Sequence, residues 1–387
     1  MTFAIGRMRG ISGAPGTVIL PTHLTHLGGR APANERVAQG RGMRMTRPQL
    51  LPANQFEHVY LGGDRIAALR GGPGGPNRPE EWLGSTTVRF GQQEQGLSRL
   101  ADGTLLRDAV AGEPAAWLGP VHLEAFGVST EVLVKLLDPD QRLPVHVHPS
   151  RAFARRHLGL PHGKTEAWIV METTPGARVR LGFRETMSRG DVRDLVDAED
   201  SAGLVDLLRP HAVHAGDAVL VPAGTPHSID AGILVLELQE PTDMSILLEW
   251  EGFAIDGETE SHLGLGRDLA LDALRLEELG DDELATLLIA GEQVPDSPLA
   301  SLLPPAADPW FRADRVRSGD VRIDAGFAVL LVTEGEGALV AERGTRLELR
   351  GGDAAVVPWA SGSWRLEGPL ETMACRPPDP AAARGAA

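Results

Sequence analysis

One short motif occurs twice in this sequence, and it constrains the possible folds more than any other feature. Gly216-Asp-Ala-Val-Leu-Val-Pro222 recurs as Gly352-Asp-Ala-Ala-Val-Val-Pro358, an offset of 136 residues (352 minus 216). Each copy predicts a Gly-Asp turn leading into a strand that proline ends, so the repeat indicates two related β-barrels. Beyond the proline the copies differ, because the first has His227 where the second has Ser363. We therefore expect the chemistry in the first barrel and a metal-free, structural second barrel.

The chain from Glu131 onwards has the pattern of a strand-rich protein. Gly and Pro together account for 75 of 387 residues (46 plus 29), about 19% against an average of roughly 12%, which favours many turns. The predicted fold class is mainly β, with two β-barrel or jelly-roll domains and a helical insertion. Apolar, β-branched runs lie at about 131–137, 143–148, 165–171, 177–183, 217–221 and 232–250, and strands resume after the proline-rich stretch 297–309 to about 372.

The remaining segments predict helices, one further strand and the domain limits. Leucines on a mostly 3-to-4 spacing predict a helix over 268–291, a shorter helical stretch is expected at about 95–118, and Ser85–Phe90 is typical of a strand. The expected organisation is a disordered N-terminal extension at 1–47, a metal-binding barrel with N-terminal segments at 48–260, a helical segment and linker at 261–309, a degenerate C-terminal barrel at 310–376 and a disordered tail at 377–387.

Composition and charge exclude several classes of partner. The formal net charge is -16, the wrong sign for a general nucleic-acid or anionic-membrane binder, and no apolar run approaches the roughly 18 residues of a membrane helix. We therefore expect neither nucleic acid nor membrane as a partner. The single cysteine, Cys375, excludes an intrachain disulfide and a Cys-based zinc finger and fits a cytoplasmic location.

Three histidines and one glutamate have the spacing of a metal site. His146 and His148 are two residues apart in Leu143-Pro-Val-His-Val-His-Pro149, so on a strand both imidazoles leave the same face. Glu166 begins another expected strand, and His227 follows the first copy of the repeat. Three imidazoles and a carboxylate can hold one divalent metal and leave room for ligand oxygens.

Several motifs in the chain resemble one family, the type I mannose-6-phosphate isomerases, which are zinc-dependent bicupins. The resemblance covers about 50–375 and implies a bicupin fold. The motifs are Val134-Lys-Leu-Leu-Asp138, Leu143-Pro-Val-His-Val-His-Pro149, Gly163-Lys-Thr-Glu-Ala-Trp168, Gly216-Asp-Ala-Val-Leu-Val-Pro-Ala-Gly-Thr-Pro-His227 and Leu236-Glu-Leu-Gln-Glu-Pro-Thr-Asp243, with the weaker Tyr60-Leu-Gly-Gly63 and Glu81-Trp-Leu-Gly-Ser85 upstream.

The resemblance also implies the ligands and the cofactor. The family's Gln, His, Glu and His fall on His146, His148, Glu166 and His227, so His146 replaces a glutamine. Zinc is the first expectation for the single divalent metal. Because a shell of three His and one Glu is similar to that of other cupins, iron, manganese and nickel stay open.

Catalytic residues carry over from the same motifs. The family's catalytic lysine two residues before the glutamate ligand falls on Lys164, and its second basic residue on Lys135; these are the only two lysines in the chain. Glu237 and Asp243 keep the family positions. The family arginine that follows Asp243 by four residues is replaced by Leu247, so the substrate's phosphate loses its expected partner. Arg151 and Arg267 are the candidates to bind substrate from another direction.

The leading hypothesis is a metal-dependent aldose–ketose isomerase that acts through an enediol on a sugar or sugar phosphate. Two other functions stay open. One is a metal-cupin oxygenase or lyase with iron or manganese, and the other is a non-catalytic sugar-binding regulator, which Leu247 permits.

Overall fold

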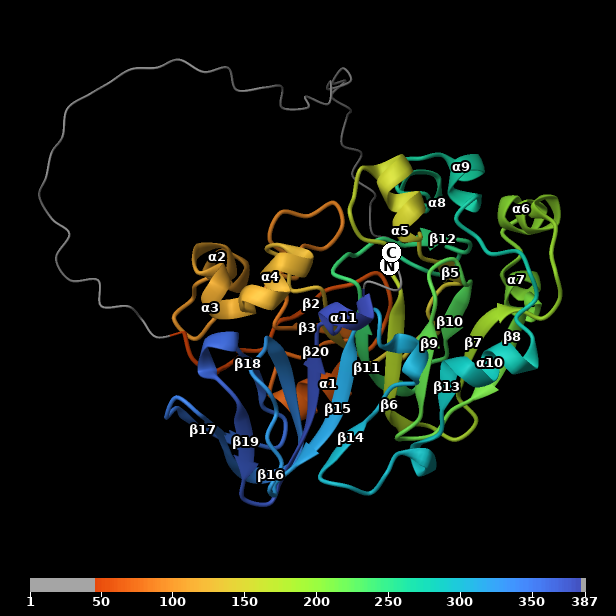
Figure 1. Cartoon of the computed structure of the whole chain (residues 1–387). Helices are drawn as coiled ribbons and strands as arrows, with labels where there is room; N and C mark the ends of the chain where they lie inside the picture. Colours follow the sequence, from red (N-terminus) through yellow and green to blue (C-terminus); the bar gives the residue numbers. More distant parts are fainter. Residues whose placement is uncertain (1–45, 384–387) are drawn as a thin grey trace, which may run out of the picture. The chain divides into compact units, whose positions relative to one another are not determined.

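Figure 1 shows a computed structural model of the chain, which describes residues 46–383. All but the last two residues of the predicted N-terminal extension, and the end of the predicted C-terminal tail, lie outside the described residues. The described strands form three sheets with antiparallel pairing, so the mainly β prediction is confirmed. Among the described residues, no helix is long and apolar enough to span a membrane.

Two sheets make up the N-terminal half, and each is antiparallel throughout. The seven-stranded sheet runs, in spatial order, β13 (Leu288–Ile289), β9 (Ala218–Val221), β6 (Glu166–Thr173), β11 (Ile233–Gln239), β4 (Leu133–Leu137), β3 (Glu80–Leu83) and β2 (Gln55–Phe56). The five-stranded sheet runs β12 (Ile246–Leu247), β5 (His146–Val147), β10 (His227–Ile229), β7 (Arg178–Phe183) and β8 (Leu208–Ala212).

One apolar core joins these two sheets. Val179 and Leu181 on β7 and Ile229 on β10 belong to the same buried cluster as Val219 and Val235 of the seven-stranded sheet. The other face of the five-stranded sheet packs under helices α6 (Arg189–Asp197) and α7 (Ser201–Leu207), which lie beside β7 and β8 in Figure 1. The five-stranded sheet is therefore covered on both faces, which protects its buried polar groups from water.

The C-terminal half is an eight-stranded sheet organised by one long strand, β16 (Ala328–Ala341). Its first part pairs with β18 and β20 and its last part with β17 and β19. The change of partners occurs near Gly335, whose φ of 82° and close approach to the Pro369 carbonyl exclude a side chain. The other strands of this sheet are β1 (Gln49–Leu50), β14 (Leu299–Ser301), β15 (Arg312–Arg317), β17 (Arg346–Arg350), β18 (Ala354–Val357), β19 (Trp364–Glu367) and β20 (Leu370–Arg376).

Both faces of the C-terminal sheet are buried. On β16, Leu330 and Val332 point into this half's own core, whereas the alternating Val329 and Leu331 belong to the core shared with the N-terminal half. This explains why the first part of the strand, Ala328–Val332, is a continuous apolar run rather than an alternating one. The described residues accordingly cluster as one compact unit.

Short helices and turns fill the connections. The α-helices are α1 (Asp64–Arg70), α2 (Leu106–Gly112), α3 (Pro114–Leu118), α4 (Pro120–Phe126), α5 (Arg151–Phe153), α8 (Gly257–Glu260), α9 (Arg267–Leu271), α10 (Asp281–Leu287) and α11 (Pro380–Ala383). The π-helical turn is η1 (Ala154–Leu158), and the 3-10 turns are η2 (Gly291–Gln293), η3 (Pro305–Ala307) and η4 (Trp359–Ser361). Helix α11 lies inside the predicted disordered tail, and its first turn is held by the Asp379 side chain, which accepts the Ala381 N–H.

The repeated motif adopts the same turn twice. Gly216 and Gly352 have φ angles of 94° and 86°, in the left-handed region that favours glycine. The carboxylates of Asp217 and Asp353 each accept the backbone N–H of the residue three positions earlier, at 2.8 and 2.9 Å. The strands that follow are β9 and β18. The repeat predicted two related β-barrels, and it forms the same turn and strand in each half of the structure.

The continuous helix predicted over 268–291 is wrong. Only α9 and α10 are helical there, and the chain between them bonds to neighbouring loops and strands. The leucines that suggested one helical face serve two different cores, since Leu274 packs in the cluster under α6 and α7 while Leu279 packs in the main core. A helix cannot face both cores with one stripe of side chains. The helical insertion is thus two short helices and two short strands, β13 and β14.

Two smaller expectations are also corrected. Ser85–Phe90 is irregular, because the Ser85 hydroxyl accepts the Thr87 N–H at 3.0 Å and turns the chain; the strand is β3, just before it. Of the helical stretch 95–118, only α2 and α3 form, and Pro114 starts the second of them.

The two motif glycines give a matched test of the turn. In Gly352→Ala the new Cβ would lie 2.0 Å from the Leu69 carbonyl oxygen, whereas in Gly216→Ala its nearest neighbour is a Gly291 carbon at 3.3 Å. We expect Gly216→Ala to lower the free energy of unfolding by about 1–2 kcal/mol, the cost of the left-handed backbone. Gly352→Ala should lower it by more than about 3 kcal/mol. Equal losses in urea denaturation would contradict the described packing of Gly352.

Candidate metal centre

Three imidazoles converge because two neighbouring strands pair in one register. His146 lies on β5 and His148 directly after it, and alternation sends both rings to one face while Val145 and Val147 enter the apolar core on the other. Strand β10 pairs with β5 so that His227 lies opposite His146. The two rings separated by one residue are 4.9 Å apart between centroids, as the spacing predicts.

The group is compact and shielded from water. His146 and His227 have ring centroids 4.1 Å apart, and His148 and His227 have centroids 4.8 Å apart. One nitrogen from each of the three lies within 4.8 Å of the others. All three side chains are buried, so a bound ion would be protected from water on the protein side.

Each ring uses one nitrogen on the backbone and turns the other to the centre. A carbonyl oxygen only accepts hydrogen bonds, so the Nδ1 atom facing it carries the proton. Every Nε2 is then left with a lone pair, the tautomer and orientation that metal-binding histidines have. The accepting carbonyl oxygens are those of Pro144 for His146 (2.7 Å), Met244 for His148 (2.8 Å) and Thr225 for His227 (2.8 Å).

Glu166, the first residue of β6, closes the group. Its Oε2 lies 3.0 Å from His148 Nε2, and its Oε1 lies 3.2 Å from His227 Nε2. With the protons on Nδ1, these are contacts between two acceptors. His227 Nε2 has no hydrogen-bond partner among residues 46–383. Converging acceptors repel one another unless a cation lies between them, so the residues present fit a divalent metal ion.

The electrostatics of the group favour the protonation states that metal ligands need. Burial, reinforced by the neighbouring imidazoles, holds the pKa of His146 well below its ordinary value, and burial next to Lys164 lowers the pKa of His148 to about 3. Burial alone would raise the pKa of Glu166, but Lys164 and the imidazoles outweigh it and hold that pKa well below the usual range. His146 and His148 are thus neutral and the Glu166 carboxyl is ionised at pH 7.

Lys164 reaches the same centre from the residue position two before Glu166. Its Nζ lies 2.8 Å from Glu166 Oε2 and 2.8 Å from His148 Nε2. The side chain is buried, and no backbone carbonyl among residues 46–383 accepts a hydrogen bond from the amine. Lys164 is therefore the cation nearest the metal-binding atoms.

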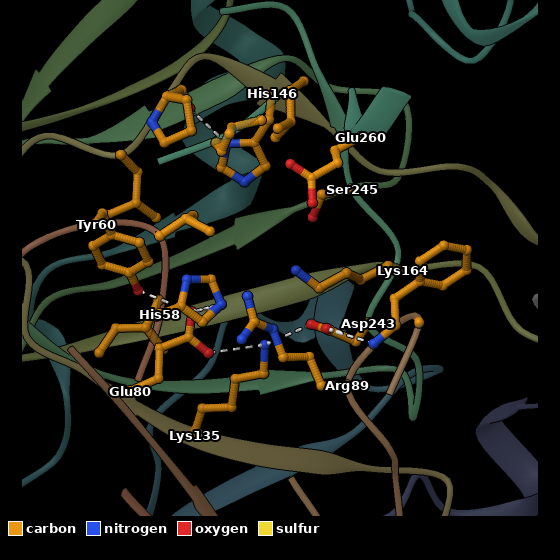
Figure 2. Close-up of a pocket in the computed structure, with 18 of the residues that line it drawn as sticks. His58, Tyr60, Glu80, Arg89, Lys135, His146, Lys164, Asp243, Ser245 and Glu260 are labelled. Atoms are coloured by element: carbon orange, nitrogen blue, oxygen red, sulfur yellow. Dashed lines mark hydrogen bonds and ion pairs between the residues drawn. The ribbon is translucent and has the colours of Figure 1, made fainter. Parts of the chain in front are cut away.

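A cavity of about 440 Å³ opens onto this centre through His146, Lys164 and Glu166. Its volume lies within the range of small-molecule sites. Figure 2 shows Lys164 between two groups of side chains: His146, Ser245 and Glu260 on one side, and Glu80, Lys135, Asp243 and Arg89 on the other.

The second group is built across the seven-stranded sheet. Antiparallel register aligns Trp82 on β3, Lys135 on β4, Glu237 on β11 and Trp168 on β6 in one row. The Lys135 ammonium lies 4.5 Å from the centre of the Trp82 ring, and the Trp168 indole donates to Glu237 at 3.2 Å. Aligned residues of neighbouring strands point to the same face, and Lys135, Glu237 and Trp168 of this row form one wall of the cavity.

Three carboxylates surround Lys135. Its Nζ lies 3.3 Å from Asp243, 3.6 Å from Glu80 and 3.6 Å from Glu237. Burial would lower the pKa of Lys135, but these carboxylates raise it above its ordinary value. Burial and the charge of Glu166 raise the pKa of Glu237 to about 7. Glu237 can therefore exchange a proton near neutral pH.

Arg151 acts on this site from outside the cavity. Its Nε lies 2.5 Å from Glu240, which is buried and accepts the Thr165 N–H at 3.0 Å. Its guanidinium also lies 4.6 Å from the centre of the Trp310 ring. Arg151 thus anchors the backbone between Lys164 and Glu166 and does not line the cavity.

Arg267 also lies outside the cavity. Its guanidinium pairs with Asp197 and Glu258 and lies 4.9 Å from the Trp250 ring centre. The contacts of Arg151 and Arg267 therefore do not support the prediction that they bind substrate. Leu247 does line the cavity, directly opposite His146 across the β5–β12 pairing.

The sequence analysis did not identify several of the residues that line the cavity. Arg89 lies on an irregular loop in a chain whose basic residues are almost all arginine, so no signal separates it from the others. Glu80 directly precedes a quoted family motif but carries no spacing of its own. The other lining residues without a sequence prediction include His58, Ser245, Thr259 and Glu260.

Comparisons with known proteins agree with this architecture. No protein-family model matches the chain. Mannose-6-phosphate isomerase from Streptococcus mutans is 30% identical over 341 residues, which span 85% of this chain and 98% of the relative. Mannose-6-phosphate isomerase ManA from Bacillus subtilis is 27% identical over 244 residues, or 62% of this chain and 73% of the relative.

Solved structures share the fold. A putative mannosephosphate isomerase from Archaeoglobus fulgidus superposes with a TM-score of 0.67 at 19% identity, over 87% of this chain and all of the other. The mannose 6-phosphate isomerase from Bacillus subtilis gives 0.65 at 21% identity, over 85% and 99%. Together with the identity and coverage of the Streptococcus relative, the motifs and the metal centre lead to one conclusion: this chain belongs to the mannose-6-phosphate isomerase family.

Proposed function

We propose that this protein is a metal-dependent aldose–ketose isomerase, with mannose 6-phosphate as the first substrate to test. The observation that carries the proposal is the contact of one buried lysine amine with two converging metal-ligand candidates, at the wall of a substrate-sized cavity. Such an arrangement joins a site for sugar oxygens to a group that can move a proton. Relatives named mannose-6-phosphate isomerase support the same substrate.

His146, His148, Glu166 and His227 would hold the metal, and zinc is the ion we propose. A site of nitrogen ligands with one carboxylate suits zinc, although iron, manganese and nickel accept the same donors. When bound, the metal supplies Lewis-acid stabilisation of the negative charge that develops on the sugar oxygens.

Lys164 would transfer the proton between the two carbons. Isomerisation removes the hydrogen from C2 of the aldose and delivers a proton to C1, while the hydroxyl proton on O2 is lost and O1 gains one. No oxidant or reductant is needed. Lys164 is buried beside the ligand atoms, so its amine can approach the carbons whose oxygens lie at the centre.

The row across the seven-stranded sheet would orient the sugar. Lys135 is held by three carboxylates and can donate to a sugar hydroxyl, and Asp243 can accept from one. Glu237, with its pKa near neutrality, can relay the hydroxyl proton between O1 and O2. These roles keep Lys135, Glu237 and Asp243 in the active site without making any of them the carbon base.

The alternatives predict different observables. A metal-cupin oxygenase would consume oxygen with bound iron, and a sugar-binding regulator would bind sugar without turnover.

Buried Cys375 has no disulfide partner among the described residues, which supports a reducing compartment such as the cytoplasm for the reaction.

Removal of two ligands should empty the site. We expect one equivalent of metal per chain in the wild type by mass spectrometry of the purified protein. His148→Ala combined with His227→Ala should retain less than about a tenth of it, because two of the four donors are lost. His214→Ala is the matched control, since that imidazole is largely exposed and lies outside the group.

Stoichiometric metal in the double variant would contradict this location of the site. A second equivalent that survives in the double variant would contradict the prediction that the C-terminal barrel is metal-free.

Exchange of Lys164 for arginine should separate proton transfer from metal binding. Lys164→Arg keeps a positive charge but removes an amine that can take up and release the proton. We expect kcat to fall roughly 100-fold to 10,000-fold, with metal content unchanged, in an assay of fructose 6-phosphate formed from mannose 6-phosphate. If the variant turns over at the wild-type rate, another residue is the base, and Lys135 is the next candidate.

A further inference from the structure

The cavity contains one cationic side chain whose charge no carboxylate compensates. Lys135 faces three carboxylates, and Lys164 faces Glu166. Arg89 lines the same cavity, and no carboxylate of the described residues lies within ion-pair distance of its guanidinium. The net positive charge available to an anionic ligand is therefore at Arg89.

The guanidinium of Arg89 is held in place by neutral groups. Its Nη1 donates to the Glu57 carbonyl at 3.2 Å and to the Gln95 side-chain oxygen at 3.0 Å. The backbone around it is a closed turn, because Arg89 N–H donates to the Gln95 carbonyl and Gln92 N–H donates to the Arg89 carbonyl. A side chain fixed through one nitrogen keeps its remaining N–H groups for a ligand at little further cost in conformational entropy.

This turn is tied to the proposed active site. The N–H of Phe90, the next residue, donates to Asp243 Oδ2 at 3.1 Å, and the other oxygen of Asp243 faces Lys135. Figure 2 shows Arg89 on the side of the cavity that carries Lys135 and Asp243, away from His146 and Glu260. A substrate with its reacting carbons near Lys164 can thus extend toward Arg89.

The opposite wall is unsuited to an anion. Leu247 lies there next to His146 in the β5–β12 pairing, and Figure 2 shows the Glu260 carboxylate on the same side of the cavity. Apolar groups cannot replace the hydrogen bonds of a phosphate, and a carboxylate repels it. Leu247, which replaces the arginine expected from the family motif, therefore cannot bind phosphate in this chain.

We propose that Arg89 binds the anionic group of the substrate, a phosphate monoester at the end of the sugar remote from the reacting carbons. This inference rests on the proposed isomerase function and specifies its substrate class. Arginine suits the task because its planar fork donates two parallel hydrogen bonds to phosphate oxygens. Arg89, on a different loop, then supplies the positive charge that is absent at Leu247.

Arg89→Gln tests the assignment, with Arg99→Gln as the matched control. Arg99 is an exposed arginine of the following segment that pairs with Glu94 and does not line the cavity. For mannose 6-phosphate we expect Arg89→Gln to raise KM about 10- to 100-fold, the loss expected for charge-assisted hydrogen bonds. Its kcat should stay within about threefold of wild type, its kcat/KM for unphosphorylated mannose should be unchanged, and Arg99→Gln should behave as wild type.

Direct binding separates a failure of this inference from a failure of the isomerase proposal. Calorimetric titration with mannose 6-phosphate and with inorganic phosphate should give a Kd that rises 10- to 100-fold in Arg89→Gln. Arg89-dependent binding without any turnover would overturn the isomerase proposal and leave the anion site standing. The role of Arg89 would be overturned if Arg89→Gln changed turnover or binding equally for mannose and mannose 6-phosphate. It would also be overturned if the variant changed neither sugar's turnover or binding.

Discussion

The unprotonated Nε2 atoms of three histidines and the carboxylate of Glu166 converge on one centre. Much of the N-terminal half holds these side chains in that arrangement. A carbonyl fixes the proton on Nδ1 of each histidine, so every Nε2 keeps a lone pair, and those of His148 and His227 face Glu166. Lys164 contacts two of these acceptors, but His227 Nε2 has no partner among the described residues, which is unfavourable for a buried acceptor unless a metal ion is bound. The antiparallel pairing of β5, β10 and β6 with their neighbours, buried on both faces, holds it in place.

The rest of the cavity is arranged around the charge of that centre. Lys164 approaches the ligand atoms, and Lys135 is balanced by carboxylates that the register of β3, β4 and β11 brings beside it. In the proposed function, these balanced lysines act on sugar hydroxyls and protons, and Arg89, on a loop rather than a strand, recognises the anion. Separate elements would then carry chemistry and substrate selection.

The sequence predicted what depends on local spacing. His146 and His148 on one face, and the turn at Gly216 repeated at Gly352, follow from alternation and backbone conformation, which neighbours along the chain decide. The leucine spacing over 268–291 predicted one helix wrongly, because these leucines are buried in two separate cores and not on one helix face. Arg89 could not be identified as a cavity residue from the sequence, because its position depends on the fold of a loop and on contacts with distant residues.

Anomalous diffraction at the metal edge, from crystals of the protein purified without chelator, tests the central claim most directly. We expect one strong peak per chain, surrounded by Nε2 of His146, His148 and His227 and by the Glu166 carboxylate. A peak elsewhere would contradict this metal centre, as would clear density in which Lys164 alone bridges these atoms in protein that retains full isomerase activity.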